Sequence, residues 1–264
     1  MTLNVLHRTV RDISSPGGVV SWEHMEHPEV SLREAWLIPL AIIAAGVILA
    51  CAIFLDRSHR VEGSEKADIT LMHPVTLADH VIGNPAAPVV LVEYADIDSP
   101  YSKTFQQTME QLMADTAASG QVAWVYRHLP LIDQHVHAAE HAEAAECAAS
   151  IGGPDMFWRF IDALNSAAPG DLQFDPANYD GVASSLGILP QSFDACMTAH
   201  TFQQKVADDF ENGIAIGAGG SPFTVLLVNG QAPVTIDGAV PYDSLKKIVD
   251  DAVAKADAAE PAAK

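Results

Sequence analysis

Ser99 and Ser102 flank Pro100 and Tyr101 in a four-residue segment that follows an apolar run and precedes an amphipathic one. Two cysteines at this spacing, at the start of a helix, would form a reactive dithiol, because the helix dipole and free backbone N–H groups stabilise a thiolate. A serine hydroxyl stays protonated at physiological pH and cannot form a disulfide. The segment therefore has the layout of a redox site without its thiols. Helix capping accounts for the same residues, since serine is a favoured N-cap and proline a favoured first helical residue.

A second group of reactive side chains occurs in His137-Ala-Ala-Glu140-His141, which matches the H-x-x-E-H pattern of inverted zinc peptidases. On a helix, His137 and His141 share one face as two metal ligands would, and Glu140 would act as the base. His128 or His135 would complete such a site. Five-residue patterns also arise by chance in a chain with 11 histidines. A His/Glu metal site is therefore only a remote alternative, and we expect no metal and no cofactor.

The three cysteines lie outside any Cys-x-x-Cys pair. Cys51 falls within an apolar segment and is expected to behave as a small hydrophobic residue. Cys147 and Cys196 lie 49 residues apart in a region with helical patterns, and neither occupies an evident helix start. A redox role is therefore not favoured for them.

The elements that must position these residues alternate between strands and helices. The apolar, β-branched run ahead of Ser99 predicts a buried strand that leads into the serine segment. Asn229-Gly230 lies between two apolar runs and predicts a β-hairpin. We expect strands over 89–98, 121–126, 223–228 and 232–236, and helices over 100–118, 202–216 and 241–254. We also expect a helical block over 135–200, interrupted at Gly152-Gly153-Pro154, Pro169-Gly170 and Gly187–Pro190.

A membrane segment is predicted near the N-terminus. Residues 35–55 are 21 residues without a charge, bounded by Glu34 and Asp56. At about 1.5 Å per residue, a helix of this length spans roughly 30 Å of hydrocarbon. The apolar core of a cleaved signal peptide would be shorter and closer to the first residue. We therefore expect one transmembrane helix.

The charges beside this segment bear on its orientation. Arg33 precedes it closely, whereas Arg57, Arg60 and Lys66 follow it. The positive-inside rule would place the C-terminal side in the cytoplasm. Long domains translocate largely regardless of such charges, so the flanking residues do not decide the matter.

The charge balance excludes a nucleic-acid-binding role. The formal net charge is −20, and residues 67–264 contain 8 basic and 26 acidic side chains. Such a surface repels nucleic acids and anionic lipids. The chain also lacks a glycine-rich phosphate loop and the Gly-x-Ser-x-Gly turn of many serine hydrolases.

Several short motifs, in chain order, resemble the DsbA-like branch of the thioredoxin superfamily. The Ser99–Ser102 segment occupies the place of its Cys-Pro-X-Cys motif. The resemblance covers about residues 75–254 and implies a thioredoxin fold, of the α/β class, with an inserted helical subdomain. The other matching motifs are Tyr126–Leu131 (a strand ending in Arg-His-Phe-Pro-Leu), Ala144–Ala148 with Phe157-Trp158 (the first inserted helix and its aromatic pair), and Gly219–Thr224 (the Gly-Thr-Pro-Thr turn).

The resemblance also implies roles for single residues. Pro222 would follow a cis peptide bond and, with Ser221, present backbone to an extended peptide. A plainer alternative is that this proline only begins a strand. Glu93 would be the buried acid beneath the missing dithiol, retained through a hydrogen bond. Cys147 and Cys196 would form a structural disulfide, with two buried thiols as the alternative. The expected binding residues are Pro100, Tyr101, Ser221 and Pro222.

We therefore expect a membrane-anchored DsbA-like protein that lacks the redox dithiol and binds extended polypeptides or an exported client protein. Its domain would lie on the extracytoplasmic, periplasmic or cell-envelope side. The alternative is a thiol:disulfide oxidoreductase that forms disulfides in exported proteins, with its cysteines lost or engineered to serine. The expected division of the chain is a tail over 1–34, a transmembrane helix over 35–55, a linker over 56–74, the DsbA-like domain over 75–254 with its insertion over about 135–216, and a tail over 255–264.

Overall fold

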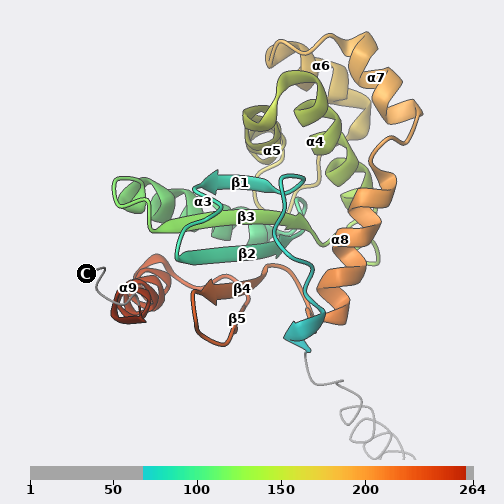
Figure 1. Cartoon of the computed structure of the whole chain (residues 1–264). Helices are drawn as coiled ribbons and strands as arrows, with labels where there is room; N and C mark the ends of the chain where they lie inside the picture. The colour runs from blue at the N-terminus through green and yellow to red at the C-terminus, as the bar shows by residue number, and fades with distance from the viewer. Residues whose placement is uncertain (1–67, 260–264) are drawn as a thin grey trace, which may run out of the picture. The chain divides into compact units, whose positions relative to one another are not determined.

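A five-stranded mixed sheet lies at the centre of the structure (Figure 1), a computed structural model that describes residues 68–259. The strand order is β1-β3-β2-β4-β5. β2 and β3 are parallel, and every other neighbouring pair is antiparallel. A parallel pair requires a crossover, which α3 supplies. The strands are β1 (His80–Gly83), β2 (Val89–Ala95), β3 (Val122–His128), β4 (Phe223–Val228) and β5 (Val234–Asp237).

The helices fall into two groups by their place in the chain. α3 joins β2 to β3 and α9 follows β5, whereas five helices are inserted between β3 and β4. In Figure 1, α4 to α7 lie beside one end of the sheet, and α8 runs back past that same end. The helices are α3 (Pro100–Thr116), α4 (Ala138–Gly152), α5 (Pro154–Ala167), α6 (Tyr179–Ser185), α7 (Pro190–Thr198), α8 (Gln203–Ala215) and α9 (Tyr242–Ala259), with short 3-10 turns η2 (Ile69–Leu71) and η3 (Pro176–Asn178).

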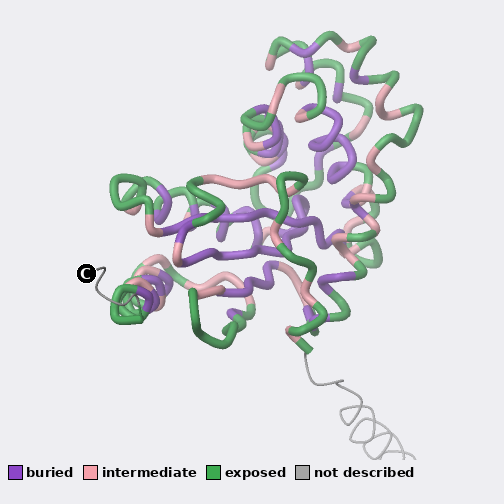
Figure 2. The backbone as a smooth tube through the Cα atoms, viewed as in Figure 1, coloured by how far each residue is buried: buried purple, intermediate pink, exposed green. Residues whose placement is uncertain are grey.

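Strand β2 is buried on both faces, as Figure 2 shows for the middle of the sheet. Val89 and Leu91 belong to a core that includes residues of α3 and α9, whereas Val90 and Val92 pack on the opposite face. Successive side chains of a strand point to opposite faces, so a strand covered on both sides becomes a continuous apolar run. This explains the apolar segment that precedes the serines.

The inserted helices have an aromatic core and a disulfide. Phe157, Phe160 and Phe193 are fully buried among them. The Cys147–Cys196 disulfide joins α4 to α7 across a sequence separation of 49. Closing a loop of that length contributes roughly 4 kcal/mol in the chain-entropy model.

Replacing both Cys147 and Cys196 by alanine is expected to lower the free energy of unfolding by about 4 kcal/mol, because the unfolded chain regains the entropy of the open loop. Urea denaturation measures this change. Thiol counting on the denatured, unreduced wild-type protein should detect one thiol, that of Cys51. Three reactive thiols would show that the bridge does not form in the protein.

The sequence predicted the strand–helix–strand unit, the insertion and the hairpin, and the structure confirms this architecture. The predicted helical block over 135–200 is divided into the four helices α4 to α7, at the three glycine- and proline-containing breaks that the sequence indicated. Strand β1 was not predicted, and its residues are only partly buried. The predicted transmembrane helix over 35–55 lies outside the described residues. Across residues 68–259, no helix combines the length and the apolar character needed to cross a membrane.

Candidate functional site

The serine segment lies where β2 passes into α3. Ser99 is the N-cap of α3, and its Oγ accepts a hydrogen bond from the backbone N–H of Ser102 at 3.5 Å. Pro100 follows as the first helical residue. Both serines are buried, whereas the side chain of Tyr101 is 68% exposed. The helix start is thus capped as the sequence predicted, with one aromatic ring facing solvent.

The loop before β4 meets this helix start. The Ser221–Pro222 peptide bond is cis. Ser221 Oγ accepts a hydrogen bond from the backbone N–H of Asp96 at 2.7 Å and shares another, also of 2.7 Å, with Ser102 Oγ. Ser99 Oγ donates a longer bond of 3.4 Å to the carbonyl oxygen of Ser221. The structure therefore brings together three serine hydroxyls that belong to two segments more than 100 residues apart.

A surface groove of about 520 Å³ lies beside Ser221, the one of these three serines that lines it. Tyr101 lines one side, and Ser221 and Pro222 line another. The remaining lining comes from the glycines before the cis bond and from the end of β5, namely Gly219, Gly220, Asp237, Gly238 and Ala239. Of the predicted binding residues, Tyr101, Ser221 and Pro222 share this groove, which we call the cis-proline groove.

Glu93 lies on β2, on the sheet face shared with Leu91 and Ala95. It is 1% exposed, and neither carboxylate oxygen has a hydrogen-bond partner among the described residues. Burial raises its pKa to about 8, although the Trp124 indole opposes the shift. Two neighbouring polar atoms also have no hydrogen-bond partner among the described residues. They are the Nε1 of Trp124 and the Oγ1 of Thr224, which lies opposite Glu93 on β4. The acid is buried as predicted, but the expected hydrogen bond that would retain it is absent.

Two aspartates beside the serine segment bind histidines of the insertion. Asp98 accepts hydrogen bonds from His141 Nδ1 at 2.9 Å on both carboxylate oxygens, and both side chains are buried. Asp96 accepts from His135 Nδ1 at 2.8 Å and from the Leu131 backbone N–H at 2.9 Å. These contacts fix the β3–α4 loop and the start of α4 against the start of α3. Neither pairing was predicted from the sequence.

Lys103 joins α3 to the insertion at a second point. Its ammonium group donates to the carbonyl oxygens of Ala168 and Leu172, each at 2.7 Å, in the segment after α5. The side chain is buried, and this burial lowers the pKa of the amine despite nearby carboxylates. Lys103 therefore holds the segment after α5 rather than serving the serines.

One buried carboxylate, that of Glu146, also fixes the C-terminal end of β3. Glu146 of α4 accepts from His128 Nε2 at 3.0 Å and His80 Nε2 at 2.9 Å, and Lys205 lies 3.4 Å away. Burial alone would raise its pKa, but the bonds from His128 and His80 hold it well below the usual range. The sequence did not reveal this cluster, because its four residues come from four elements that lie far apart in the chain.

The structure divides the predicted His/Glu metal pattern. His141 is buried against Asp98, whereas His137 Nδ1 pairs with Glu140 at 3.3 Å near the surface. His128 and His135 bind other carboxylates. Within residues 68–259, no three His, Cys, Asp or Glu side chains converge as metal ligands would. The pattern therefore serves packing and hydrogen bonding here, and the geometry of a zinc peptidase is not formed.

Comparison with known proteins identifies the family. A family model described as Thioredoxin matches residues 76–251. The chain belongs to the thioredoxin family. Among solved structures of similar fold are BdbD from Bacillus subtilis, with 22% identity, a TM-score of 0.59 and coverage of 69% of this chain and 97% of that one, and α-DsbA1 from Wolbachia pipientis, with 18%, 0.58, 72% and 97%. The thioredoxin fold with a DsbA-like helical insertion is thus established.

Curated relatives carry a different name. The chain is 33% identical over 176 residues to a protein named Na⁺/H⁺ antiporter NhaA 1 from Salinispora arenicola, and the match covers 66% of this chain and 25% of that protein. A protein of the same name from Mycolicibacterium gilvum is 29% identical over 198 residues, with 73% and 30% coverage. The chain therefore spans only about a quarter to a third of the length of these relatives.

In this thioredoxin-family protein, the groups around the serines restrict the possible chemistry. The hydroxyls of Ser99 and Ser102 bond to Ser221 and to backbone atoms, and within the described residues neither bonds to a histidine, lysine or carboxylate. A serine nucleophile requires an adjacent general base. Among the described residues, the serine segment therefore has neither a thiol pair nor a general base beside a serine hydroxyl.

Proposed function

We propose that this chain is a redox-inert member of the DsbA-like proteins that binds extended polypeptide in the cis-proline groove, as a chaperone-like or assembly module. The observation that carries the proposal is the hydrogen bond between Ser102 and Ser221, which joins two hydroxyls where the family resemblance places thiol chemistry. Hydroxyls do not exchange with disulfides. The groove would therefore bind a client polypeptide through noncovalent contacts alone.

The binding mode follows from the groups that line the groove. An extended peptide would pair with the backbone at Ser221 by strand addition, which is a recurrent mode of peptide recognition. The exposed ring of Tyr101 would cover an apolar side chain of the peptide. The contact is short and ordering the peptide opposes binding, so we expect weak affinity.

Tyr101→Ala is expected to weaken binding of carboxymethylated insulin B chain several-fold, because the exposed ring is the large apolar group of the groove. The melting temperature should change by less than about 2 °C, because an exposed side chain contributes little to folding. Anisotropy of the labelled peptide and a thermal melt measure the two effects. Leu77→Ala, at a fully exposed residue outside the groove, is the matched control. Unchanged peptide affinity in folded Tyr101→Ala would exclude this groove as the binding surface.

The alternative function is thiol:disulfide exchange with cysteines at positions 99 and 102. The retained Glu93 favours it, because a carboxyl group with a pKa of about 8 suits proton transfer near neutral pH and has no evident structural use. In that case the serines would be replacements in an otherwise intact enzyme.

We further propose that residues 35–55 tether the domain to a membrane and that the domain faces away from the cytoplasm. The uncharged 21-residue run supports the tether. The Cys147–Cys196 bridge supports an oxidising compartment, where structural disulfides persist. We assign no ion transport to the chain, because its match covers only 25–30% of each of the two antiporter-named relatives.

A further inference from the structure

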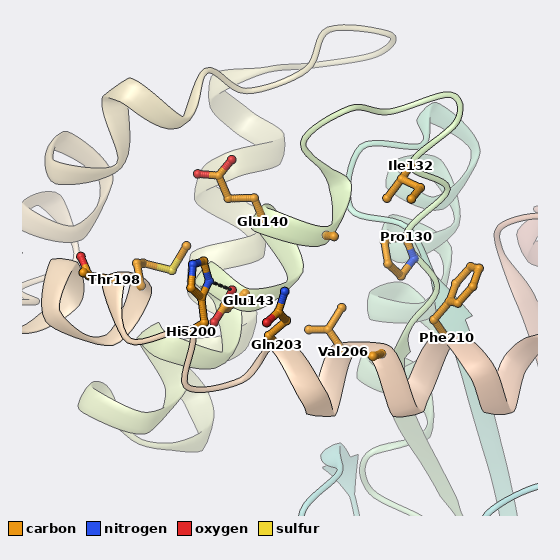
Figure 3. A pocket seen from close by; sticks show the side chains of 12 residues that line it. Pro130, Ile132, Glu140, Glu143, Thr198, His200, Gln203, Val206 and Phe210 are labelled. Atoms are coloured by element: carbon orange, nitrogen blue, oxygen red, sulfur yellow. Dashed lines mark hydrogen bonds and ion pairs between the residues drawn. The ribbon is translucent and has the colours of Figure 1, made fainter.

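A second groove, of about 710 Å³, lies between the insertion and the β3–α4 loop (Figure 3). Apolar side chains line much of it: Val206 and Phe210 project from α8, and Pro130 and Ile132 come from the loop. Ile132 is 59% exposed, which is unusual for an isoleucine beside a concave surface. Pockets of this volume with mainly apolar walls are typical binding sites.

Acidic side chains lie along the same groove. Glu140 and Glu143 come from α4, and the lining residues include no lysine or arginine. Glu143 is buried and accepts a hydrogen bond from the Phe202 backbone N–H at 3.3 Å, while His200 Nδ1 lies 3.2 Å from its other oxygen. Glu140 is exposed at the rim and pairs with His137. The groove therefore combines apolar walls with negative charge.

The backbone at the rim is held in an uncommon conformation. His200 has a φ of 49°, the only positive φ of a non-glycine residue among residues 68–259. This conformation costs an L-residue free energy and persists where surrounding contacts impose it. Here it places the imidazole beside Glu143 at the mouth of the groove, as Figure 3 shows.

The shape of the groove indicates what it binds. Gln203, Val206, Ala207 and Phe210 follow the i, i+3, i+4, i+7 spacing of one face of α8 and line the groove, with Gln203 exposed, Ala207 and Phe210 partly buried and Val206 buried. Residues of α4 form part of the lining beside it. A partner helix in this groove would contact side chains of both α4 and α8, as in helix-in-groove recognition.

We propose that the groove between α4, α7 and α8 binds an amphipathic, basic helix of a partner protein. Leucine-sized side chains of that helix would contact Ile132 and Phe210, and its lysines or arginines would face Glu140. The site shares no lining residue with the cis-proline groove. It is therefore a second binding surface, independent of the proposed polypeptide binding.

The test uses the full-length protein and a fluorescein-labelled, 18-residue helical peptide of leucine and lysine, titrated by anisotropy. Ile132→Glu and Glu140→Lys should each weaken binding roughly tenfold, because they place a charge on the apolar wall or reverse the charge at the rim. The matched controls are Leu77→Glu and Asp243→Lys, which make the same changes at exposed residues elsewhere and should alter affinity less than about twofold.

Three results would overturn the proposal. The first is equal affinity in the groove variants and the control variants. The second is equally tight binding of a peptide in which glutamate replaces every lysine. The third is loss of binding in Tyr101→Ala together with displacement by carboxymethylated insulin B chain, which would place the peptide in the cis-proline groove. Failure of insulin B chain to bind at all would count against the proposed polypeptide binding and leave this site unaffected.

Discussion

Glu93→Gln is expected to raise the free energy of unfolding by up to about 5 kcal/mol at pH 8, while changing it little below pH 4.5. Below its ordinary pKa, this carboxyl group is protonated in both the folded and the unfolded chain. Between pH 4.5 and about 8 the unfolded chain releases the proton, whereas the buried group retains it. The wild-type protein therefore loses stability as pH rises through this range, and glutamine removes the loss.

The measurement is urea denaturation of both proteins at several pH values, and the quantity of interest is the difference between them. Taking this difference cancels the other titrating groups, including Glu146, whose lowered pKa acts in the opposite direction. A constant difference between Glu93→Gln and wild type from pH 4.5 to 8 would mean that Glu93 is ionised in the folded protein.

With oxidised glutathione as the oxidant that regenerates its disulfide, the double variant Ser99→Cys/Ser102→Cys is expected to catalyse oxidation of a reduced peptide roughly a hundredfold or more faster than the wild type, which should not exceed the uncatalysed rate. The first cysteine would lie at the N-cap of α3, where backbone N–H groups and the helix dipole stabilise a thiolate. The second would replace the hydroxyl that bonds to Ser221. A fluorogenic peptide with two thiols reports the rate.

The single variant Ser99→Cys is the control, because one thiol cannot form the internal disulfide that would oxidise the peptide. If the wild type turns over substrate and the Cys147→Ala variant does not, the bridge of the insertion would be the redox centre. If the double variant remains inactive while folded, the site has diverged beyond its two serines, which would favour the binding function.

The sequence was informative where local patterns decide the structure. Val89–Ala95 is apolar because both faces of β2 are covered, and Ser99-Pro100 is a local capping signal that requires no tertiary information. Strand β1 escaped prediction because it has four residues, pairs with β3 alone and ends at Gly83, so it has no clear period. Short edge strands are determined by their partners rather than by their own residues.

The surroundings of the site were less accessible from the sequence. Asp98 and His141 lie 43 residues apart, and they meet because the start of α4 lies against the segment between β2 and α3. His141 belongs to a metal-binding pattern in the sequence because its spacing from His137 along a helix is the only geometry that the sequence supplies. The apolar face of α8 did carry a signal, since Val206 and Phe210 are four residues apart, but the sequence does not show that this face lines a groove.

The bond between Ser102 and Ser221 has a kinetic consequence. In an enzyme with two thiols, a client held as a mixed disulfide leaves when the second thiol attacks that bond, so chemistry sets the residence time. With hydroxyls at positions 99 and 102, a client polypeptide bound as proposed would leave by simple dissociation. Its dissociation rate would be set by its contacts with the cis-proline groove. Occupancy then follows client concentration and does not depend on the glutathione or quinone poise of the compartment.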